Sequence, residues 1–383
     1  MNGSIGCSCD CDDPSDMTAT SPTIEIVTTE QHWETLSAEW DRLLATLPEA
    51  TAFQSPAFLR CWWRHFGEEL APHVVTARRG GELVGIAPLQ LRRQRRFGRG
   101  YRTLEFLGSP DELARPRLLV PAGDDETLTA ILQAIAARRS GWDMIWLDEL
   151  ETGGWQAAAI ERWAKSAGLW VRSEPLHPVS WLDKNGTWQE YLAARSAHFR
   201  KRLRAAARRL ERECTVAWEQ CHGGPDMRRF VDLFLQVEKS SWKAREGYDI
   251  GYEAGYRRFY ADLLAHNSAA LRGHGLALTV DGQPAAVTLG VSGHGRYYSL
   301  QIAHDAAFDR YSPGTLLEAR EMEWFFGEPE LRRYEFLGGD NANKRRWAGH
   351  VMETCSLIIR RPGIHMAVAD FRRFYLHSKR SPD

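Results

Sequence analysis

The sequence predicts an α/β fold in which a mixed, largely antiparallel sheet flanked by helices occurs twice. Three observations support this fold class. The order of β-rich runs, Gly-containing turns and helical segments in the first half recurs in the second half. Hydrophobic residues make up 43% of the chain and charged residues 26%, a balance typical of chains with a sizeable core. A length of 383 residues favours two or three domains, or one domain duplicated.

The first copy is predicted over residues 23–183, after a disordered tail at 1–22 that is rich in small and acidic residues. It begins with a β-branched strand and a helix at 33–47 whose apolar residues recur at helical spacing. Ser55 is a typical N-cap for the next helix, with Pro56 in the first helical position. Three β-rich runs with short turns then predict an antiparallel meander, which a helix, a buried strand and another helix follow: HVVTA, LVGIAPLQL, YRTLEFLG, DETLTAILQAIAARRS, WDMIWLDEL and WQAAAIERWAKSAG.

The second copy is predicted over residues 184–383 and repeats this order. Two helices precede a meander, and a helix, a strand and a final strand follow it: MRRFVDLFLQVEKSSW, YRRFYADLLAHN, LALTV, AAVTLGVS, RYYSLQIA, TLLEAREMEWFF, RRYEFLGGD and ETCSLIIRR. Residues 81–86 correspond to 282–287, and residues 142–147 to 332–337. Identity between the halves is low, so the repeat is inferred from the order of elements.

A strongly basic helix is predicted at 191–213, where the second copy begins. Between Arg195 and Arg212 it carries eight Lys or Arg and one acid, and Ala, Arg and Leu favour helix. One interpretation is a solvated face, the usual outcome for a run of like charges. The other is a surface on which Arg200, Lys201 and Arg204 bind an anionic partner such as a nucleotide, a nucleotide-sugar, RNA or an acidic protein.

The overall composition excludes several classes of function. The formal net charge is −1, so attraction to polyanions has to be local. The sequence shows neither a membrane-length apolar run nor a signal-peptide core, and a cytoplasmic protein is expected. The seven Cys suggest no disulfide framework, and Cys7, Cys9 and Cys11 fall in the tail, where metal binding is the less favoured interpretation. HExxH, Walker and nucleophile-elbow motifs are absent, so no metal site is predicted.

The segment from Arg296 to Trp347 is the strongest candidate for a functional site. A Pro313-Gly314 loop opens a helix directly after a strand, and free N–H groups at such a helix start suit phosphates. A Gly338-Gly339-Asp340 turn then leads into three basic residues. We therefore expect this segment to hold a phosphate-bearing donor and the chemistry.

Four motifs together resemble a known family: AFQSPAFLRCWW, the GIAPL meander, SPGTLLEA and FLGGDNANKRRW. In order and spacing they are similar to the CelD/BcsL-type acetyltransferases of the GNAT superfamily, which are often linked to cellulose or exopolysaccharide synthesis. The two-copy layout also resembles the Fem-type aminoacyl transferases, which use aminoacyl-tRNA. The resemblance covers nearly the whole chain after the tail and implies a tandem GNAT-like fold.

The resemblance further implies transfer of an acyl group from acetyl-CoA or another acyl-CoA. GNAT enzymes bind the CoA pyrophosphate with a strand–loop–helix, which here corresponds to Tyr311, Ser312, Gly314 and Thr315. Pro313 and Thr315 stand where that loop usually has glycines. The first copy has PAGDDETL at this place, and its two acids would repel a pyrophosphate, so it is expected not to bind donor.

Acyl transfer needs a base for the acceptor proton and a group that stabilises the thioester oxyanion. Candidate bases are Glu238, Asp340, Asp305 and His304, of which His304 is less favoured; each also has an ordinary interpretation as a solvated or packed side chain. Lys344 resembles a lysine that Fem-type enzymes carry after the last core strand and would neutralise developing charge. Arg345 is a candidate anion contact, and both cations have an alternative as exposed charges at a helix start.

Three functions follow from these patterns. The first is an N- or O-acyltransferase acting on a sugar, a nucleotide-sugar or a polysaccharide precursor. The second is a Fem-like transferase whose basic helix holds tRNA. The third is an inactive scaffold in exopolysaccharide synthesis. The sequence predicts neither the acceptor nor the oligomeric state.

Overall fold

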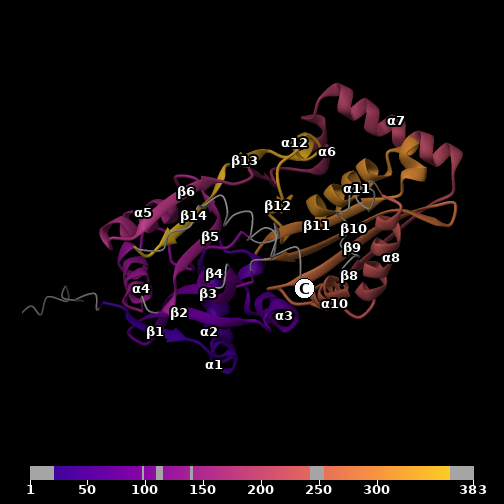
Figure 1. Ribbon diagram of the computed structural model, residues 1–383. Helices are drawn as coiled ribbons and strands as arrows, with labels where there is room; N and C mark the ends of the chain where they lie inside the picture. The colour runs from indigo at the N-terminus through magenta and orange to yellow at the C-terminus, as the bar shows by residue number, and fades with distance from the viewer. Residues whose placement is uncertain (1–20, 97–98, 109–114, 139–140, 242–253, 363–383) are drawn as a thin grey trace, which may run out of the picture.

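The fold consists of two sheets side by side, each with helices on both faces (Figure 1). The structure, a computed structural model, describes residues 21–96, 99–108, 115–138, 141–241 and 254–362. Cys7, Cys9 and Cys11 of the predicted tail lie outside the described residues. Two mixed seven-stranded sheets flanked by helices confirm the predicted fold class.

The first sheet has the strand order β1-β2-β3-β4-β5-β14-β6. Strands β2 to β4 form the predicted antiparallel meander, β1 pairs with β2 in antiparallel, and β5 pairs with β4 in parallel. The strands are β1 (Thr23–Val27), β2 (Leu70–Arg79), β3 (Glu82–Arg96), β4 (Arg99–Phe106), β5 (Met144–Glu151), β14 (Thr354–Arg360) and β6 (Trp170–Pro175).

The second sheet has the order β13-β7-β12-β11-β10-β9-β8 and repeats this plan. Strands β8 to β11 are antiparallel, and β12 pairs with β11 in parallel. The strands are β13 (His350–Met352), β7 (Val179–Asp183), β12 (Arg333–Glu335), β11 (Arg296–His304), β10 (Gln283–Gly293), β9 (Arg272–Val280) and β8 (Val216–His222).

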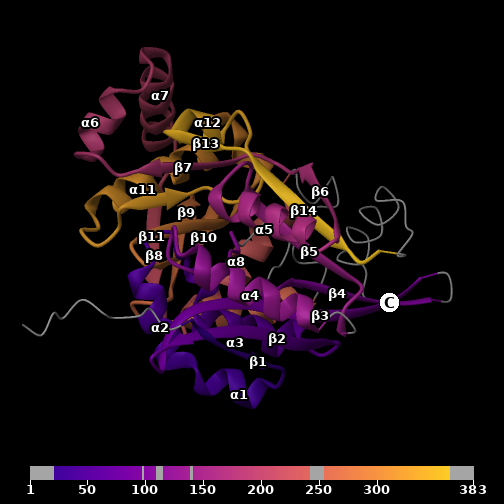
Figure 2. The same cartoon turned by 90° about the vertical axis from the view of Figure 1, so that its left-hand side faces the viewer.

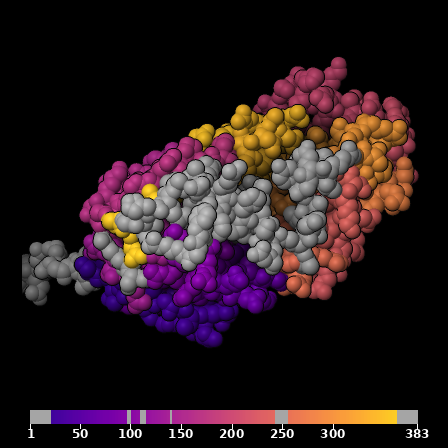
Figure 3. Space-filling view, in the orientation of Figure 1, coloured from indigo at the N-terminus to yellow at the C-terminus, as the bar shows by residue number. Residues whose placement is uncertain are grey.

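The two sheets exchange strands across the predicted boundary between residues 183 and 184. Strand β7 comes before this boundary but pairs with β12 and β13 in the second sheet. The C-terminal strand β14 returns to the first sheet between β5 and β6, where Figures 1 and 3 show it in yellow among magenta elements. Each sheet therefore contains one strand from the other predicted domain. The division into domains at residue 183 stays a prediction.

Helices cover both faces of each sheet. Figure 2 shows α4 and α5 side by side on one face of the first sheet, while α2 and α3 lie on the other side. In the second sheet α8 and α10 cover one face and α11 the other, with α6 and α7 outside α11. The helices are α1 (Glu30–Thr35), α2 (Ser37–Thr46), α3 (Pro56–Phe66), α4 (Asp125–Ala137), α5 (Trp155–Ser166), α6 (Trp188–Ala193), α7 (Ala197–Glu213), α8 (Met227–Lys239), α10 (Ala254–Ala265), α11 (Pro313–Gly327) and α12 (Lys344–Trp347), with short 3₁₀ turns η1 (Ala52–Gln54) and η4 (Ala306–Tyr311).

The two halves share a hydrophobic core. Buried aromatic residues of α1, α2, α3 and the turn η1 pack with residues of α8, α10 and the second sheet, as in the edge-to-face contact of Phe53 in η1 with Tyr298 at 4.7 Å between ring centroids. Separate cores lie under α4 and α5 in the first copy and under α11 in the second. Because burial of apolar area is the main favourable term in folding, we expect the halves to unfold together.

Three predicted elements differ from those observed. The predicted helix at 33–47 is interrupted at Leu36, where the Thr35 and Ser37 hydroxyls donate to nearby backbone carbonyls. The basic helix predicted at 191–213 begins only at Ala197, because the Ser196 side chain caps a new helix by accepting from the Phe199 N–H. The predicted strand at 332–340 ends at Glu335, since the chain turns into positive φ two residues later.

Candidate active site

A cleft opens in the second sheet where β11 and β12 separate. The two strands pair only over Arg296–Tyr298 and Arg333–Glu335, and beyond these residues the strands diverge. The cleft has a volume of about 590 Å³. Its walls come from β11, the start of α11 and the segment after β12: Ser299, Leu300, Gln301, Ile302, His304, Gly314, Thr315, Glu318, Tyr334, Phe336, Leu337, Gly338, Gly339, Asn341, Asn343 and Lys344.

A β-bulge in β11 lies on the wall of this cleft. Ser299 pairs with Gly290 and Gln301 with Leu289, so Leu300 is an extra residue in the ladder. A bulge takes one peptide out of the regular hydrogen-bond pattern and bends the strand. Leu300 therefore presents its backbone at the point where the two strands part.

The N-terminus of α11 borders the same cleft. Ser312 adopts a left-handed conformation with φ of 55°, and Pro313 occupies the first helical position. The next two residues, Gly314 and Thr315, line the cleft, and the first-turn N–H groups of a helix have no partner inside the helix. A Cβ added at Gly314 would lie 3.2 Å from His304 Nδ1, so glycine keeps this approach open. This helix start is suited to an anionic group such as a phosphate.

Of the four residues predicted to bind the donor, the cleft walls contain two. Gly314 and Thr315 lie there, whereas Tyr311 is 1% exposed and packs in the core beside α7. The Tyr311 hydroxyl lies 3.2 Å from Cys214 Sγ. Ser312 is half-buried and contributes the turn rather than a cleft wall.

Lys344 begins the short helix α12 and lies on the cleft wall. Its ammonium donates to the carbonyl oxygen of Leu337 and, at 2.8 Å, to that of Gly339. Both of these residues also line the cleft, and Leu337 is held at positive φ. Lys344 therefore fixes the shape of the turn that follows β12.

Asp340 and Arg345 pair with each other beside the cleft. Asp340 accepts from the Ser180 hydroxyl at 2.6 Å and from Arg345 Nε. Burial alone would raise the pKa of Asp340, but these two donors lower it below its usual value. Neither residue is among the cleft walls. A carboxylate stabilised as an anion is a weak proton acceptor, which makes Asp340 a structural ion-pair partner here.

Glu238 lies on the far side of the second sheet from α11. It is 1% exposed on α8, and its carboxylate is near enough to Tyr260 to raise the pKa of that phenol, which burial raises most. Gln301, on the cleft wall, donates to the Tyr260 hydroxyl at 3.2 Å. Glu238 is therefore not among the cleft walls, although Tyr260 and Gln301 connect its surroundings to the cleft. His304 lines the cleft and pairs with Asp309 at 3.0 Å, whereas Asp305 caps the 3₁₀ turn η4.

Glu318 is the carboxyl group that the sequence analysis missed. It lies one turn after Gly314 on α11, lines the cleft, and accepts from Asn343 Nδ2 at 2.6 Å and from Trp347 Nε1 at 3.0 Å. Burial raises the pKa of Glu318 to about 7, although these two hydrogen bonds act in the opposite direction. A carboxyl with such a pKa can exchange a proton with a reactant near neutral pH.

Another carboxyl group on α11, that of Glu321, is buried next to Tyr334, a residue of the cleft wall. Glu321, 3% exposed, accepts from Tyr297 at 2.6 Å, from Thr288 at 2.9 Å and from the Tyr334 hydroxyl. Burial raises the pKa of Glu321, and its charge contributes to the raised pKa of Glu318. This network connects α11 to three strands and holds Glu318 in place.

The basic residues predicted to bind an anionic partner lie outside the cleft. Lys201 and Arg204 are exposed on α7, and Arg200 is half-buried. Leu203 and Leu210 turn inward to the core next to α11. Arg209 donates to the Arg310 carbonyl at 3.1 Å, which ties α7 to the loop before α11. The structure thus places the predicted basic surface next to the cleft but not in it.

At the matching place in the first copy, a carboxylate occupies the helix start. Asp124 caps α4 by accepting from the Thr127 N–H at 3.0 Å, and Asp125 accepts from Trp155 Nε1 at 2.8 Å. Asp124 therefore takes a helix N–H group that a phosphate would need. Elsewhere in the described residues, no group of three or more His, Cys, Asp or Glu is arranged to hold a metal ion.

Part of the chain is similar to a known domain family. Residues 197–345 match the model of the acetyltransferase (GNAT) domain family. No curated protein matches the chain. Among solved structures, the chain is similar to FemX, with a TM-score of 0.62, 14% identity, and coverage of 83% of this chain and 95% of FemX.

Two further structures are similar over most of the chain. One is a conserved protein of unknown function from Bacteroides thetaiotaomicron, with a TM-score of 0.52, 13% identity, and coverage of 88% and 100%. The other is a tandem GNAT protein from the clavulanic acid biosynthesis pathway, with a TM-score of 0.49, 16% identity, and coverage of 89% and 100%. At such identities a structural match shows the fold alone. Residues 197–345, which include the basic helix, the cleft and Lys344, are thus the part of the chain that is similar to the GNAT acetyltransferase domain family, and the chain as a whole is similar in fold to FemX.

Proposed function

We propose that the protein is an acyltransferase that moves an acetyl or longer acyl group from acyl-CoA to an amine or hydroxyl group. The observation that carries the proposal is the meeting, in one cleft, of a helix start open to phosphate and a carboxyl group with a pKa of about 7. The N–H groups of Gly314 and Thr315 would bind the CoA pyrophosphate. The thioester would then lie between β11 and β12, next to the Leu300 bulge.

The chemistry needs no covalent intermediate on the enzyme. The acceptor nitrogen or oxygen attacks the thioester carbonyl while Glu318 takes the acceptor proton. Collapse of the tetrahedral intermediate breaks the C–S bond, and the CoA thiolate leaves and takes up a proton. Lys344 acts as a positioning residue, because its ammonium binds the carbonyl groups of Leu337 and Gly339, which lie on the cleft wall formed by the segment after β12.

We further propose a sugar, nucleotide-sugar or polysaccharide precursor as the acceptor and a cytoplasmic location, as the resemblance to CelD/BcsL-type acetyltransferases implies. In the part of the chain that the structure describes, no helix is long and apolar enough to cross a bilayer. The transfer of an acyl group to nitrogen or to oxygen is equally compatible with a Glu318 base.

Replacing Gly314 by Asp tests the donor site. A carboxylate at the start of α11 repels phosphate, and its Cβ crowds His304, so we expect acetyl-CoA to bind about tenfold more weakly or worse. Isothermal titration calorimetry measures the change. Gly327→Asp is the matched control, because a Cβ at Gly327 meets no atom within 4 Å at the other end of the same helix. If neither acetyl-CoA nor a longer acyl-CoA binds the wild-type protein, the proposal fails.

A second candidate function is an aminoacyl-tRNA-dependent transferase, which the FemX-like fold and the exposed basic face of α7 favour. Under this candidate, tRNA binding weakens steeply as salt rises, and Lys201→Glu with Arg204→Glu reduces both the affinity and the salt slope. Filter binding at several salt concentrations measures both quantities. Charge reversal of Glu211, which lies on the same helix, to Lys is the control and should not weaken binding. A tRNA affinity that is unchanged in the Lys201→Glu, Arg204→Glu variant would exclude this candidate. The absence of turnover with any donor would favour the inactive scaffold.

A further inference from the structure

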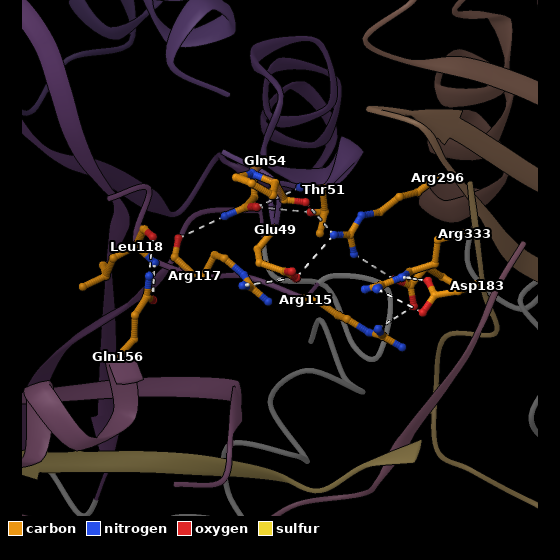
Figure 4. Close-up of polar contacts among 12 residues, drawn as sticks. Glu49, Thr51, Gln54, Arg115, Arg117, Leu118, Gln156, Asp183, Arg296 and Arg333 are labelled. Atoms are coloured by element: carbon orange, nitrogen blue, oxygen red, sulfur yellow. Dashed lines mark hydrogen bonds and ion pairs between the residues drawn. The ribbon is translucent and has the colours of Figure 1, made fainter. Parts of the chain in front are cut away.

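A second cavity lies in the first copy, between the segments that follow β4 and β5. Its volume is about 210 Å³. The walls are largely apolar and include Leu47, Pro116, Leu118, Leu150 and Ala157. The wall is also preformed, because Gln156 donates to the Leu118 carbonyl at 2.7 Å and accepts from the Leu118 N–H at 3.1 Å (Figure 4). A small preformed apolar cavity with few polar groups is typical of a small-molecule site.

One guanidinium on this wall has unused donors. Arg117 is 28% exposed at the side chain and lines the cavity. Within the described residues its guanidinium donates no hydrogen bond, and its ion pair with Glu49 is long, at 3.9 Å. Figure 4 shows Glu49 between Arg117 and Arg296, and the Arg296 pair is the shorter, at 3.3 Å. An arginine has five N–H donors, and a partly buried one whose donors make no hydrogen bond is costly unless a ligand satisfies them.

An exposed carboxylate, that of Glu151, lines the same cavity as this guanidinium. Glu151 ends β5 and lines the cavity together with Gly154, and a Cβ added at Gly154 would lie 2.9 Å from the Glu151 Cβ. Burial lowers the pKa of Arg117, while Glu49 and Glu151 raise it, so both carboxylates are within electrostatic reach of the guanidinium. In the described chain Glu151 has no ion pair. Glu149 is already paired with His177, at 3.4 Å.

We propose that this cavity binds a free α-amino acid with an apolar side chain. Arg117 takes the carboxylate and Glu151 takes the ammonium group, and the side chain packs on Leu47, Leu118 and Leu150. A zwitterion satisfies both charged groups at once, whereas an anion alone would face Glu151 and a cation alone would face Arg117. A phosphate ligand is disfavoured because Asp124 already occupies the nearby start of α4. The site is independent of the donor cleft and of the proposed acyl transfer.

Three probes of nearly equal shape test the charge pattern in the full-length protein. Leucine carries both charges, 4-methylpentanoate carries only the carboxylate, and 3-methylbutylamine carries only the ammonium group. Titration followed by ligand-observed NMR should show leucine binding about tenfold or more tightly than either single-charge probe, because each lost contact is a charged hydrogen bond. Arg117→Gln should bring leucine down to the affinity of the amine. Glu151→Gln should bring it down to that of the carboxylate.

Arg162→Gln is the matched control, since Arg162 is exposed on α5, the helix that supplies Gln156. Leucine affinity should not change in this variant, nor when acetyl-CoA is present at saturation. Equal affinity for the three probes, no leucine binding at millimolar concentration, or unchanged binding in Arg117→Gln would each overturn the proposal. Competition by acetyl-CoA would also overturn it, because the leucine would then be in the donor cleft. None of these readouts depends on acyl transfer, so the failure of either proposal leaves the other standing.

Discussion

Glu318→Gln should lower the rate of acyl transfer by roughly 10²- to 10⁴-fold, the contribution typical of a positioned general base. The amide oxygen can still accept from Trp347 Nε1, and its NH2 group can donate to Asn343 once that side chain turns its Oδ1 toward it, but the amide cannot take a proton. In the wild-type protein kcat/KM should rise with pH through about 7, because only the ionised carboxylate acts as a base. The variant should lose this rise. A thioester-cleavage assay from pH 5.5 to 8.5 measures both effects.

The same substitution should stabilise the protein at high pH. A carboxyl group whose folded-state pKa exceeds its unfolded value binds more protons when folded, so its contribution to stability is lost as pH rises from about 4.5 to about 7. Above pH 7 the charged, half-buried Glu318 lowers the free energy of unfolding by up to about 3 kcal/mol, a cost that the neutral amide avoids. Urea unfolding at pH 5 and pH 8 should show a gain only at pH 8. Glu323→Gln is the control on the exposed side of the same helix, and it should change neither rate nor stability. Equal rates in Glu318→Gln and wild type would remove Glu318 as the base.

Local patterns in the sequence predicted most of the elements and the general place of the site. Ser55 caps α3, with Pro56 following, as expected, and the two meanders form where β-rich runs alternate with Gly-containing turns. Gly314 and Thr315 lie in the cleft because the strand–loop–helix order determines where a helix begins. These features depend on residues a few positions apart, which a sequence shows directly.

Features that depend on distant residues were not predictable in the same way. The pairing of β14 with β5 and β6 joins segments about two hundred residues apart, and no local pattern encodes such a partner. In the sequence Glu318 looks like any glutamate on a helix. Only in the folded chain do Asn343 and Trp347, 25 and 29 residues later, donate hydrogen bonds to its carboxylate. Asp340 is the opposite case. The sequence makes it a candidate base, but Ser180, 160 residues earlier, donates a hydrogen bond that stabilises its anionic form. Burial and partners, rather than residue type, set the chemistry of these carboxyls.

Glu335→Gln should destabilise the protein by about 3 to 5 kcal/mol, the cost of removing one partner from a buried ion pair. Glu335 is fully buried at the end of β12. It pairs with Arg296 at 3.0 Å and with Arg115, which comes from the first copy. Arg296 also donates to the Pro48 carbonyl at 2.8 Å. The substitution would leave two buried guanidinium groups, one from each half, without their shared carboxylate. Urea unfolding at pH 7 measures the loss.

Two further variants separate the missing charge from ordinary packing effects. Glu330→Gln removes an exposed carboxylate a few residues earlier and should change stability by less than about 0.5 kcal/mol. The triple variant Arg115→Met, Arg296→Met, Glu335→Leu removes all three charges, and it should recover most of the loss because apolar residues of similar volume replace a buried ionic network at little cost. If the triple variant were less stable than Glu335→Gln, the network would be a net source of stability rather than a matched set of charges. Glu335 directly precedes the cleft residues Phe336 and Leu337, so the network also links the first copy to the wall of the cleft.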